Sequence, residues 1–150
     1  SYYQEYGLEY TIFRFFNTYG PNQSEDFVLP RFLKLAIQGE DINIYGDGLQ
    51  TRSFCYVDDN VETCLKAITN ASCINAVLNV GSDKEQTILS LAEEIIDLTN
   101  SKSKIIHLPA LEEGDMARRC PDTTKMKIIL GRELISLEEG VQKLVAYYKK

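Results

Sequence analysis

Three arginines and one asparagine are the side chains of this sequence that best suit an anionic ligand. Arg52 follows a glycine-containing turn sequence, and its planar guanidinium can hold a phosphate group through two parallel hydrogen bonds. Arg118 and Arg119 are neighbours in a stretch of loop composition. Asn17 stands where a β-branched and aromatic run ends, which is where open α/β sheets bind ligands, and its amide can donate to a phosphate oxygen. These residue types predict an anion site.

Each of these residues also has a plainer interpretation. Asn17 can simply begin a turn, and Arg52 can be an exposed arginine of the surface. Asp115 precedes Arg118 and Arg119 closely enough to form a local ion pair with one of them. Residue type alone therefore leaves both interpretations open.

A Gly-x-Gly sequence occurs in "INIYGDGLQTRSF", residues 42–54. A loop that binds dinucleotide phosphates needs a third glycine three residues after the second and a helix directly after it. Thr51 occupies that position, and "TRSFCYV" has the alternating aromatic and β-branched composition of a strand. We predict a β-hairpin instead, with Asp47 and Gly48 at its turn, because glycine readily adopts the positive φ of a tight turn.

Side chains for nucleophilic or metal chemistry are sparse. His107 is the single histidine and is expected to be a packed or surface residue of a strand. The four cysteines have no C-x-x-C spacing and are expected to be reduced thiols without a zinc ion. They are Cys55, Cys64, Cys73 and Cys120. Asp58 and Asp59 are best explained as a helix cap. We predict no metal site and no catalytic residue within this chain.

The composition is that of an ordinary globular protein. A chain of 150 residues has the length of one average domain, and its 44% of hydrophobic and 25% of charged residues argue against disorder. The net charge of -6 disfavours non-specific binding to nucleic acids. No apolar run approaches the roughly 20 residues that cross a bilayer. We expect a cytoplasmic protein that binds neither nucleic acid nor membrane, and the start at Ser1 indicates a fragment or a trimmed product.

Strands and helices alternate along the sequence and predict an α/β or α+β unit. Besides the hairpin, we predict a buried strand at 8–16 and further strands at 76–81 and 104–109. Helical periodicity and capping residues predict five helices, which begin at Leu29, Asp58, Thr87, Thr123 and Ser136. The first is expected to end at a Gly39 cap. The inward side chains of the second, which runs to about Asn70, are predicted to be Val61, Leu65 and Ile68.

Four segments together resemble the C-terminal half of the extended short-chain dehydrogenase/reductase family. They are "YGLEYTIFRFFNTYGP", "FVLPRFLKLAIQGEDINIYGDGLQTRSFCYVDD", "LNVGSDKEQTILSLAEEI" and "GDMARRCPDTTKMKIILG". Members of this family modify sugar nucleotides, among them UDP-glucose 4-epimerase, dTDP-glucose 4,6-dehydratase and UDP-glucuronate decarboxylase. The resemblance implies a Rossmann-type α/β fold. Residues 1–150 would be its C-terminal substrate-binding portion, with mixed short strands and helices, and the N-terminal NAD-binding half would be absent.

The resemblance implies roles for particular residues in contact with the diphosphate of a sugar nucleotide. Asn17 of "NTYGP" is similar to the family asparagine that contacts this group, and Arg52 of "QTR" is similar to an arginine that binds it. One of Arg118 and Arg119 resembles a second arginine that reaches ribose or phosphate, and "MARRCPD" leaves open which of them it is.

Other residues resemble positions that border the nucleotide base and the cofactor. Leu29 and Pro30 match a helix start beside the base, and Tyr45 matches an aromatic position that flanks it. Phe15 and Phe16 match positions near the nicotinamide of NAD.

The sequence also departs from the family pattern, because it contains no Tyr-x-x-x-Lys and no Gly-rich dinucleotide loop. Ser1 to Glu5 resemble the tail of the helix that carries the tyrosine and lysine. The implied intact protein is a homodimeric, NAD-dependent enzyme that acts on a UDP- or dTDP-sugar, and this chain alone is expected to be inactive. The alternative is a non-catalytic binding or assembly module of the same fold. Epimerase, dehydratase and decarboxylase remain open, as do the base and the sugar.

Overall fold

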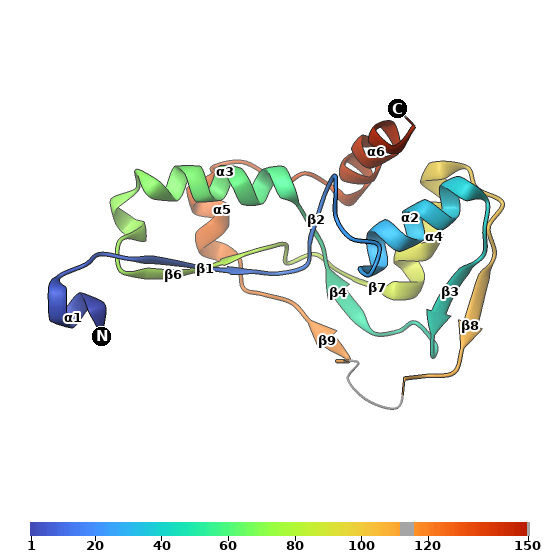
Figure 1. The fold of residues 1–150 in the computed structure, drawn as a ribbon, viewed down its shortest axis with the longest axis horizontal. Helices are drawn as coiled ribbons and strands as arrows, with labels where there is room; N and C mark the ends of the chain where they lie inside the picture. Colours follow the sequence, from blue (N-terminus) through green and yellow to red (C-terminus); the bar gives the residue numbers. More distant parts are fainter. Residues whose placement is uncertain (112–115, 150) are drawn as a thin grey trace.

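A two-stranded parallel sheet with two helices on one face forms one side of the molecule (Figure 1). The computed structural model describes residues 1–111 and 116–149. In it, β1 (Thr11–Phe15) pairs in parallel with β6 (Ala76–Val80), and α3 (Val57–Ile68) and α5 (Thr124–Leu130) cover this sheet. We call these four elements the sheet region.

A second group of elements forms the other side, and we call it the pocket region (Figure 1). Its β3 (Ile42–Tyr45) pairs in parallel with β8 (Ile105–Leu108). Helices α2 (Val28–Gln38) and α4 (Ile88–Thr99) pack against each other and against β3, and α6 (Leu137–Tyr148) packs against both helices. Their core side chains are almost fully buried and include Leu29, Phe32, Leu33, Ile44, Leu91, Ile95 and Leu144.

Short strands connect the two regions. A parallel pair is formed by β2 (Thr18–Tyr19) and β5 (Cys55–Tyr56). Another strand, β4 (Thr51–Ser53), lies between antiparallel β7 (Glu85–Thr87) and parallel β9 (Arg118–Arg119). The remaining short elements are α1 (Tyr2–Tyr6) and the 3-10 turn at Ala71–Cys73. Several of these two- and three-residue elements give no periodic signal in the sequence.

The predicted helix ends are confirmed where a capping residue is present. Gly39 follows α2 in the left-handed conformation, with φ of 73°. The Thr87 hydroxyl accepts a hydrogen bond from the N–H of Ser90 at the start of α4, over 3.0 Å. The Ser136 hydroxyl accepts one from the N–H of Glu139 at the start of α6, over 3.1 Å.

The predicted hairpin is wrong. Strand β3 pairs with β8, and β4 pairs with β7 and β9, so the two runs do not pair with each other. Gly46 and Gly48 do turn the chain, with φ of 68° and 73°. The turn packs against the start of α4, where the Gly48 carbonyl accepts a hydrogen bond from the N–H of Leu89. The chain therefore leaves β3 instead of folding back along it.

The predicted inward face of the helix at 57–68 is also wrong. Val61, Leu65 and Ile68 are 53%, 61% and 78% exposed. The buried face of α3 instead carries Asp59, Asn60, Thr63 and Ala67. The cap prediction fails too, since Tyr56 is the N-cap residue and no side chain caps this helix.

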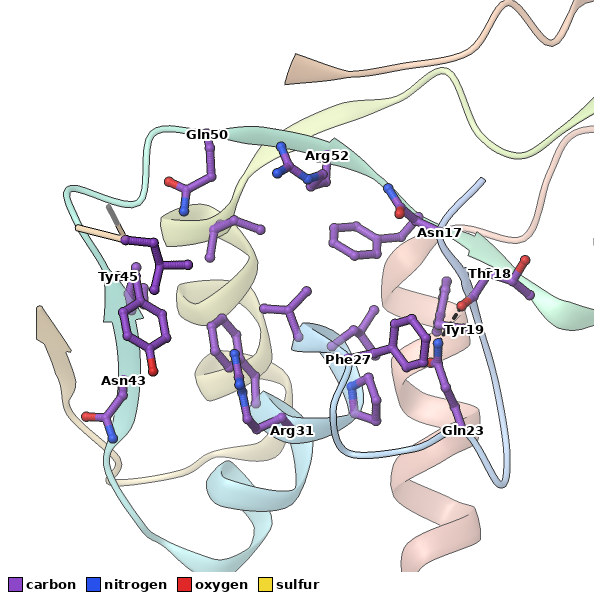
Figure 2. A pocket seen from close by; sticks show the side chains of 18 residues that line it. Asn17, Thr18, Tyr19, Gln23, Phe27, Arg31, Asn43, Tyr45, Gln50 and Arg52 are labelled. Atoms are coloured by element: carbon purple, nitrogen blue, oxygen red, sulfur yellow. Dashed lines mark hydrogen bonds between the residues drawn. The ribbon is translucent and has the colours of Figure 1, made fainter. Parts of the chain in front are cut away.

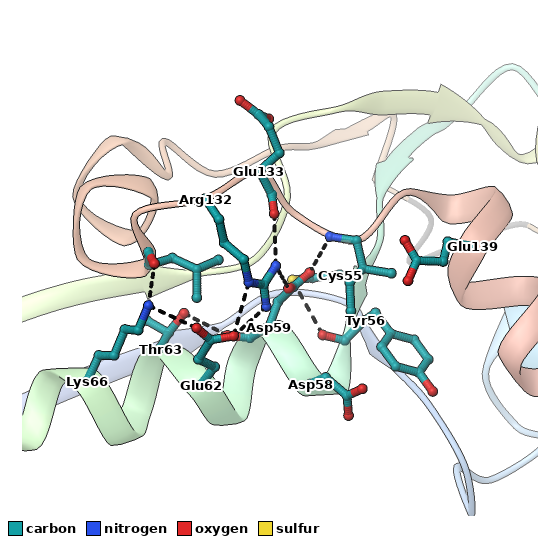
Figure 3. Close-up of polar contacts among 12 residues, drawn as sticks. Cys55, Tyr56, Asp58, Asp59, Glu62, Thr63, Lys66, Arg132, Glu133 and Glu139 are labelled. Atoms are coloured by element: carbon teal, nitrogen blue, oxygen red, sulfur yellow. Dashed lines mark hydrogen bonds and ion pairs between the residues drawn. The ribbon is translucent and has the colours of Figure 1, made fainter.

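A network of charges explains why α3 buries a polar face (Figure 3). The carboxylate of Asp59 is fully buried, lies 2.7 Å from a guanidinium nitrogen of Arg132, and accepts a hydrogen bond from the N–H of Ile135. Arg132 also pairs with Glu62, which in turn pairs with Lys66 over 2.9 Å. Because a buried carboxylate needs its partners, Asp59 determines which side of the helix faces inward.

Strand β1 is less buried than the composition of residues 8–16 predicts. Ile12 is 49% exposed and Phe15 is 56% exposed. In the described part of the chain β1 has β6 as its single neighbouring strand, and the cluster with α3 and α5 covers the face that carries Phe13. Parallel strands normally have both faces covered and are apolar on both. Because one face of β1 is uncovered in the described chain, its apolar side chains are exposed there.

Candidate functional site

A cavity of about 390 Å³ opens between α2, β3 and the connecting strands (Figure 2). Its volume lies in the range of small-molecule sites, about 300 to 1,000 Å³. One wall is the first turn of α2, a second is β3 at residues 43–45, and the others come from residues 17–19 and 50–54. Residues far apart in the sequence thus meet around one space.

Asn17 lies at the edge of this cavity, directly after β1. Its backbone has a positive φ of 29°, which asparagine tolerates better than most residues. The side-chain amide nitrogen donates to the carbonyl oxygen of Ser53 over 3.0 Å. This hydrogen bond ties Asn17 to β4, and the amide nitrogen carries a second hydrogen that can serve a ligand.

Arg52 lines the cavity from β4. One guanidinium nitrogen donates to the carbonyl oxygens of Thr51 and Met116, over 2.8 Å and 2.6 Å. These two backbone acceptors restrict the orientation of the guanidinium. Arg52 can therefore present a positioned positive charge to an anion.

The register of β9 places the two adjacent arginines on opposite faces of the strand. Arg119 stands opposite Arg52, and Arg118 stands opposite Thr51. Because successive side chains of a strand point to opposite faces, Arg119 shares the face of Arg52 and Arg118 does not. Neither Arg118 nor Arg119 is among the cavity-lining residues, and Asp115 lies outside the described residues.

Arg118 is held by an acidic partner. Its guanidinium makes a two-pronged contact with the carboxylate of Glu85, with nitrogen to oxygen distances of 3.0 Å and 2.7 Å. This contact, with a further hydrogen bond from Thr51, keeps the pKa of the Glu85 carboxyl below its usual value. Arg118 thus has a structural ion pair in β7 and β9.

The first turn of α2 and the exposed face of β3 supply the apolar and aromatic walls. Leu29 and Pro30 line the cavity from the start of the helix, where both are buried. Phe27 precedes this turn and offers no side-chain acceptor, so the positive end of the helix is uncapped. Tyr45 lines the cavity from β3 and is 39% exposed. A flat ligand group would find an aromatic ring at this end.

The remaining predicted residues, Phe15 and Phe16, do not line the cavity. They lie at the end of β1, where the N–H of Phe16 donates to the carbonyl oxygen of Val80 over 2.9 Å. Phe15 is 56% exposed. The structure thus brings Asn17, Leu29, Pro30, Tyr45 and Arg52 together, while the phenylalanines lie outside the cavity, on the sheet side.

Several cavity-lining residues were not predicted from the sequence. They are Thr18, Tyr19, Gln23, Phe27, Val28, Arg31, Phe32, Asn43, Ile44, Gln50, Phe54, Ile88 and Leu111. The two-residue period of strands offers a signal for part of this set, since Asn43 precedes Tyr45 by two positions, and Gln50 and Phe54 flank Arg52 in the same way. No comparable signal marks Gln23 or Leu111.

The described lining contains cationic, amide, hydroxyl and aromatic groups but no carboxylate, imidazole or thiol. Burial, and secondarily the charges of Cys55 and Asp59, raises the pKa of the Tyr19 hydroxyl, so this group stays protonated. The cavity is therefore suited to holding a polar anion, and the residues that line it offer no evident proton-transfer group.

The rest of the described chain presents no metal-binding cluster and no paired cysteines. Residues 1–111 and 116–149 contain no group of three His, Cys, Asp or Glu side chains able to hold a metal ion. All four cysteines are free thiols, and Nδ1 of His107 lies 2.8 Å from the carbonyl oxygen of Gly46. Within the same ranges no helix has both the length and the apolar character needed to cross a bilayer.

Comparison with known proteins gives relatives along the whole chain. A UDP-N-acetyl-alpha-D-glucosaminuronate decarboxylase of Bacillus cytotoxicus is 37% identical over 96% of this chain, which spans 47% of that protein. The UDP-glucuronic acid decarboxylase 1 of Danio rerio is 38% identical over the whole chain, which spans 36% of it. The chain thus spans about half or less of the length of these curated relatives.

Solved structures agree with the sequence relatives. The structure of UDP-glucose 4-epimerase with UDP-glucose from Thermotoga maritima has a TM-score of 0.89 and 34% identity, over 99% of this chain and 48% of that one. A UDP-glucuronic acid 4-epimerase of Bacillus cereus, in complex with UDP-glucuronic acid and NAD, has a TM-score of 0.85 and 26% identity. These matches confirm the predicted α/β fold class and family resemblance. The model of the NAD dependent epimerase/dehydratase family matches residues 1–81, and the chain belongs to this family.

Proposed function

We propose that this chain is the C-terminal substrate-binding portion of an NAD-dependent sugar-nucleotide epimerase, dehydratase or decarboxylase. Its cavity holds the nucleoside diphosphate part of a UDP- or dTDP-sugar. The observation that carries this proposal is the meeting of an arginine, an asparagine amide, a helix N-terminus and a tyrosine ring around one space. The names of the relatives, which are decarboxylases and epimerases of UDP-sugars, support the same substrate class.

In this proposal the diphosphate lies between Arg52, Asn17 and the uncapped first turn of α2. Arginine forks, amides and helix N-termini are all donors to phosphate oxygens. The base lies at the other end, between Tyr45 and the start of α2. Arg119 is the second arginine of the site, because it shares the face of Arg52, whereas Arg118 is committed to Glu85.

The cofactor NAD would be bound mainly by an N-terminal half. Phe15 and Phe16, at the end of β1, fit a place beside the nicotinamide because Phe15 offers exposed aromatic surface there. NAD, when bound, would accept a hydride from the sugar. The residues of this chain hold and orient the substrate, and without a Tyr-x-x-x-Lys pair the chain alone does not turn it over.

The test is a calorimetric titration of UDP into the intact protein. Arg52→Ala is expected to weaken binding by about 1.5 to 3 kcal/mol, the scale of a hydrogen bond to a charged group. Arg119→Ala is expected to act in the same direction, and Arg118→Ala is the matched control, since it removes the same charge from an arginine that pairs with Glu85. Unchanged affinity in Arg52→Ala, or an equal loss in the Arg118→Ala control, would contradict the assignment.

The second candidate function is a non-catalytic binding or assembly module, favoured by the lack of an acid or base among the described cavity residues. Absorbance and fluorescence spectra of the purified intact protein separate the two candidates, because a catalytic member retains NAD. The intact protein is further proposed to be a cytoplasmic homodimer, which light scattering and cell fractionation would test.

A further inference from the structure

Arg31 is a cavity-lining cation without a counter-charge in the described chain. It lies on α2, directly after Pro30, and is partly exposed. Its guanidinium carbon lies 5.9 Å from the centre of the Phe32 ring. Among residues 1–111 and 116–149, no hydrogen bond or ion pair engages this guanidinium. All of its donors are therefore available to a ligand.

The position of Arg31 is unfavourable for the isolated helix. Cations near a helix N-terminus meet the positive end of the macrodipole, and the first turn of α2 has no acidic residue to offset this. Lys34, on the same helix, has an acidic partner in Glu25 at 2.7 Å. A side chain that breaks a local rule without a compensating ion pair or hydrogen bond is a candidate for function.

The cavity geometry indicates which part of a ligand Arg31 would meet. In Figure 2 the side chain of Arg31 lies across the cavity from Arg52 and toward Tyr45. Asn43 and Tyr45 project from the same face of β3, since the intervening Ile44 is buried. The group next to Arg31 is therefore the one that borders Tyr45, which under the proposed function is the nucleotide base.

We propose that Arg31 selects the base by donating a hydrogen bond to its C4 carbonyl oxygen. A guanidinium has donors and no acceptor. It therefore favours uracil or thymine, which present a carbonyl at C4, over cytosine, which presents an amino group there. Asn43 cannot make this distinction, because an amide both donates and accepts and can rotate to suit either base. This inference rests on the proposed nucleoside diphosphate site.

The experiment compares UDP with CDP, which share ribose and phosphates and differ in the pyrimidine. Both are titrated calorimetrically into the intact protein and its variants. The unmodified protein is expected to prefer UDP by about tenfold or more, and Arg31→Ala is expected to lose about tenfold in affinity for UDP but less than about twofold for CDP. Arg31→Glu, whose carboxylate accepts from the cytosine amino group, is expected to favour CDP over UDP.

Lys34→Ala is the matched control, because it removes the same charge from the same helix outside the cavity lining. It is expected to leave the UDP to CDP ratio unchanged. Thermal unfolding of each variant checks the fold, and Arg31→Gln replaces Arg31→Ala should the smaller side chain destabilise α2.

Two outcomes would overturn the inference. Equal losses for UDP and CDP in Arg31→Ala would assign the arginine to the phosphates, and an unchanged affinity for both nucleotides would remove it from the site. Failure of the proposed function looks different, since the folded unmodified protein would then bind neither nucleotide.

Discussion

Two helices of similar amphipathic character, α2 in the pocket region and α3 in the sheet region, bury opposite kinds of side chain. Helix α2 buries Leu29, Phe32 and Leu33, as its hydrophobic pattern predicts. Helix α3 buries Asp59 and Asn60 and exposes its apolar stripe. The difference teaches that an amphipathic pattern alone does not say which face of a helix packs against its own chain, since a paired buried carboxylate can lie on that face.

The two regions differ also in how completely they are covered. The pocket region has a closed core of three helices and two strands. The sheet region leaves apolar side chains exposed on β1, α3 and α5, among them Ile12, Phe15, Leu65, Ile68 and Ile128. Apolar surface of this kind marks an interaction site, which agrees with the proposal that an NAD-binding half packs against the sheet region.

The largest expected effect is the loss of a core side chain in the pocket region. Phe32 is 1% exposed, and Phe32→Ala is expected to lower the free energy of unfolding by about 4 kcal/mol through lost burial and a cavity. Ile68 in the sheet region is 78% exposed, and in this chain alone Ile68→Ala is expected to change the free energy of unfolding by less than about 0.5 kcal/mol. Urea denaturation measures both, and similar losses would break the distinction between the two helices.

A smaller effect is expected from the charge network under α3. Arg132→Met leaves the buried Asp59 carboxylate without its cation and is expected to cost about 2 kcal/mol, less than for a fully buried pair because Arg132 is 37% exposed. Adding Asp59→Asn removes the stranded charge and is expected to recover part of the loss in a double-mutant cycle. Additive losses would show that Arg132 and Asp59 are not energetically coupled.

The smallest effects are expected from pH, with opposite signs in the two regions. Hydrogen bonds from Lys66 and then Arg132 lower the pKa of Glu62, so its contribution is present above its usual value of 4.5 and is lost as pH falls through the lowered pKa. Burial, and then Glu138, raises the pKa of Glu94 on α4, so its contribution is full below 4.5 and is lost as pH rises through the raised pKa.

Thermal unfolding of Glu62→Gln and Glu94→Gln between acidic and neutral pH measures these contributions. Glu62→Gln is expected to destabilise the protein at neutral pH and to match the unmodified protein in acid. Glu94→Gln is expected to stabilise the protein at neutral pH, because a partly buried charge is removed, and to have less effect in acid. The same sign for both variants would contradict the contrast.

Much of the fold could be predicted because residues with capping chemistry mark the ends of several helices. Gly39, Thr87 and Ser136 delimit helices through local contacts that their own residue types supply. The pairing of β3 could not be predicted in this way, because its partner β8 lies some 60 residues further on, as in Ile42 opposite Ile105. The turn itself was predictable, since Gly46 and Gly48 both have positive φ. The direction that the chain takes after the turn depends on a contact with α4, which is distant in the sequence.

The site shows the same division. Asn17, Arg52 and Tyr45 carry types and positions that predict a ligand site, and all three line the cavity. The proposed preference for Arg119 over Arg118 rests on the register of a two-residue strand, which sequence spacing does not predict. Arg31 could not be predicted, because an arginine in an amphipathic helix is ordinary in sequence, and only the structure shows its place in the cavity and its lack of an ion pair among the described residues.

The buried thiol of Cys55 offers a way to measure how often strands β2 and β5, which border the cavity, separate. Cys55 is 1% exposed and pairs across the strands with Thr18, a cavity-lining residue. Burial, and then the charge of Asp59, raises the pKa of this thiol to about 12, so an alkylating reagent finds almost no thiolate while β2 and β5 stay together. The alkylation rate of Cys55 therefore reports how often these strands separate. A ligand that holds β2 and β5 together is expected to lower this rate.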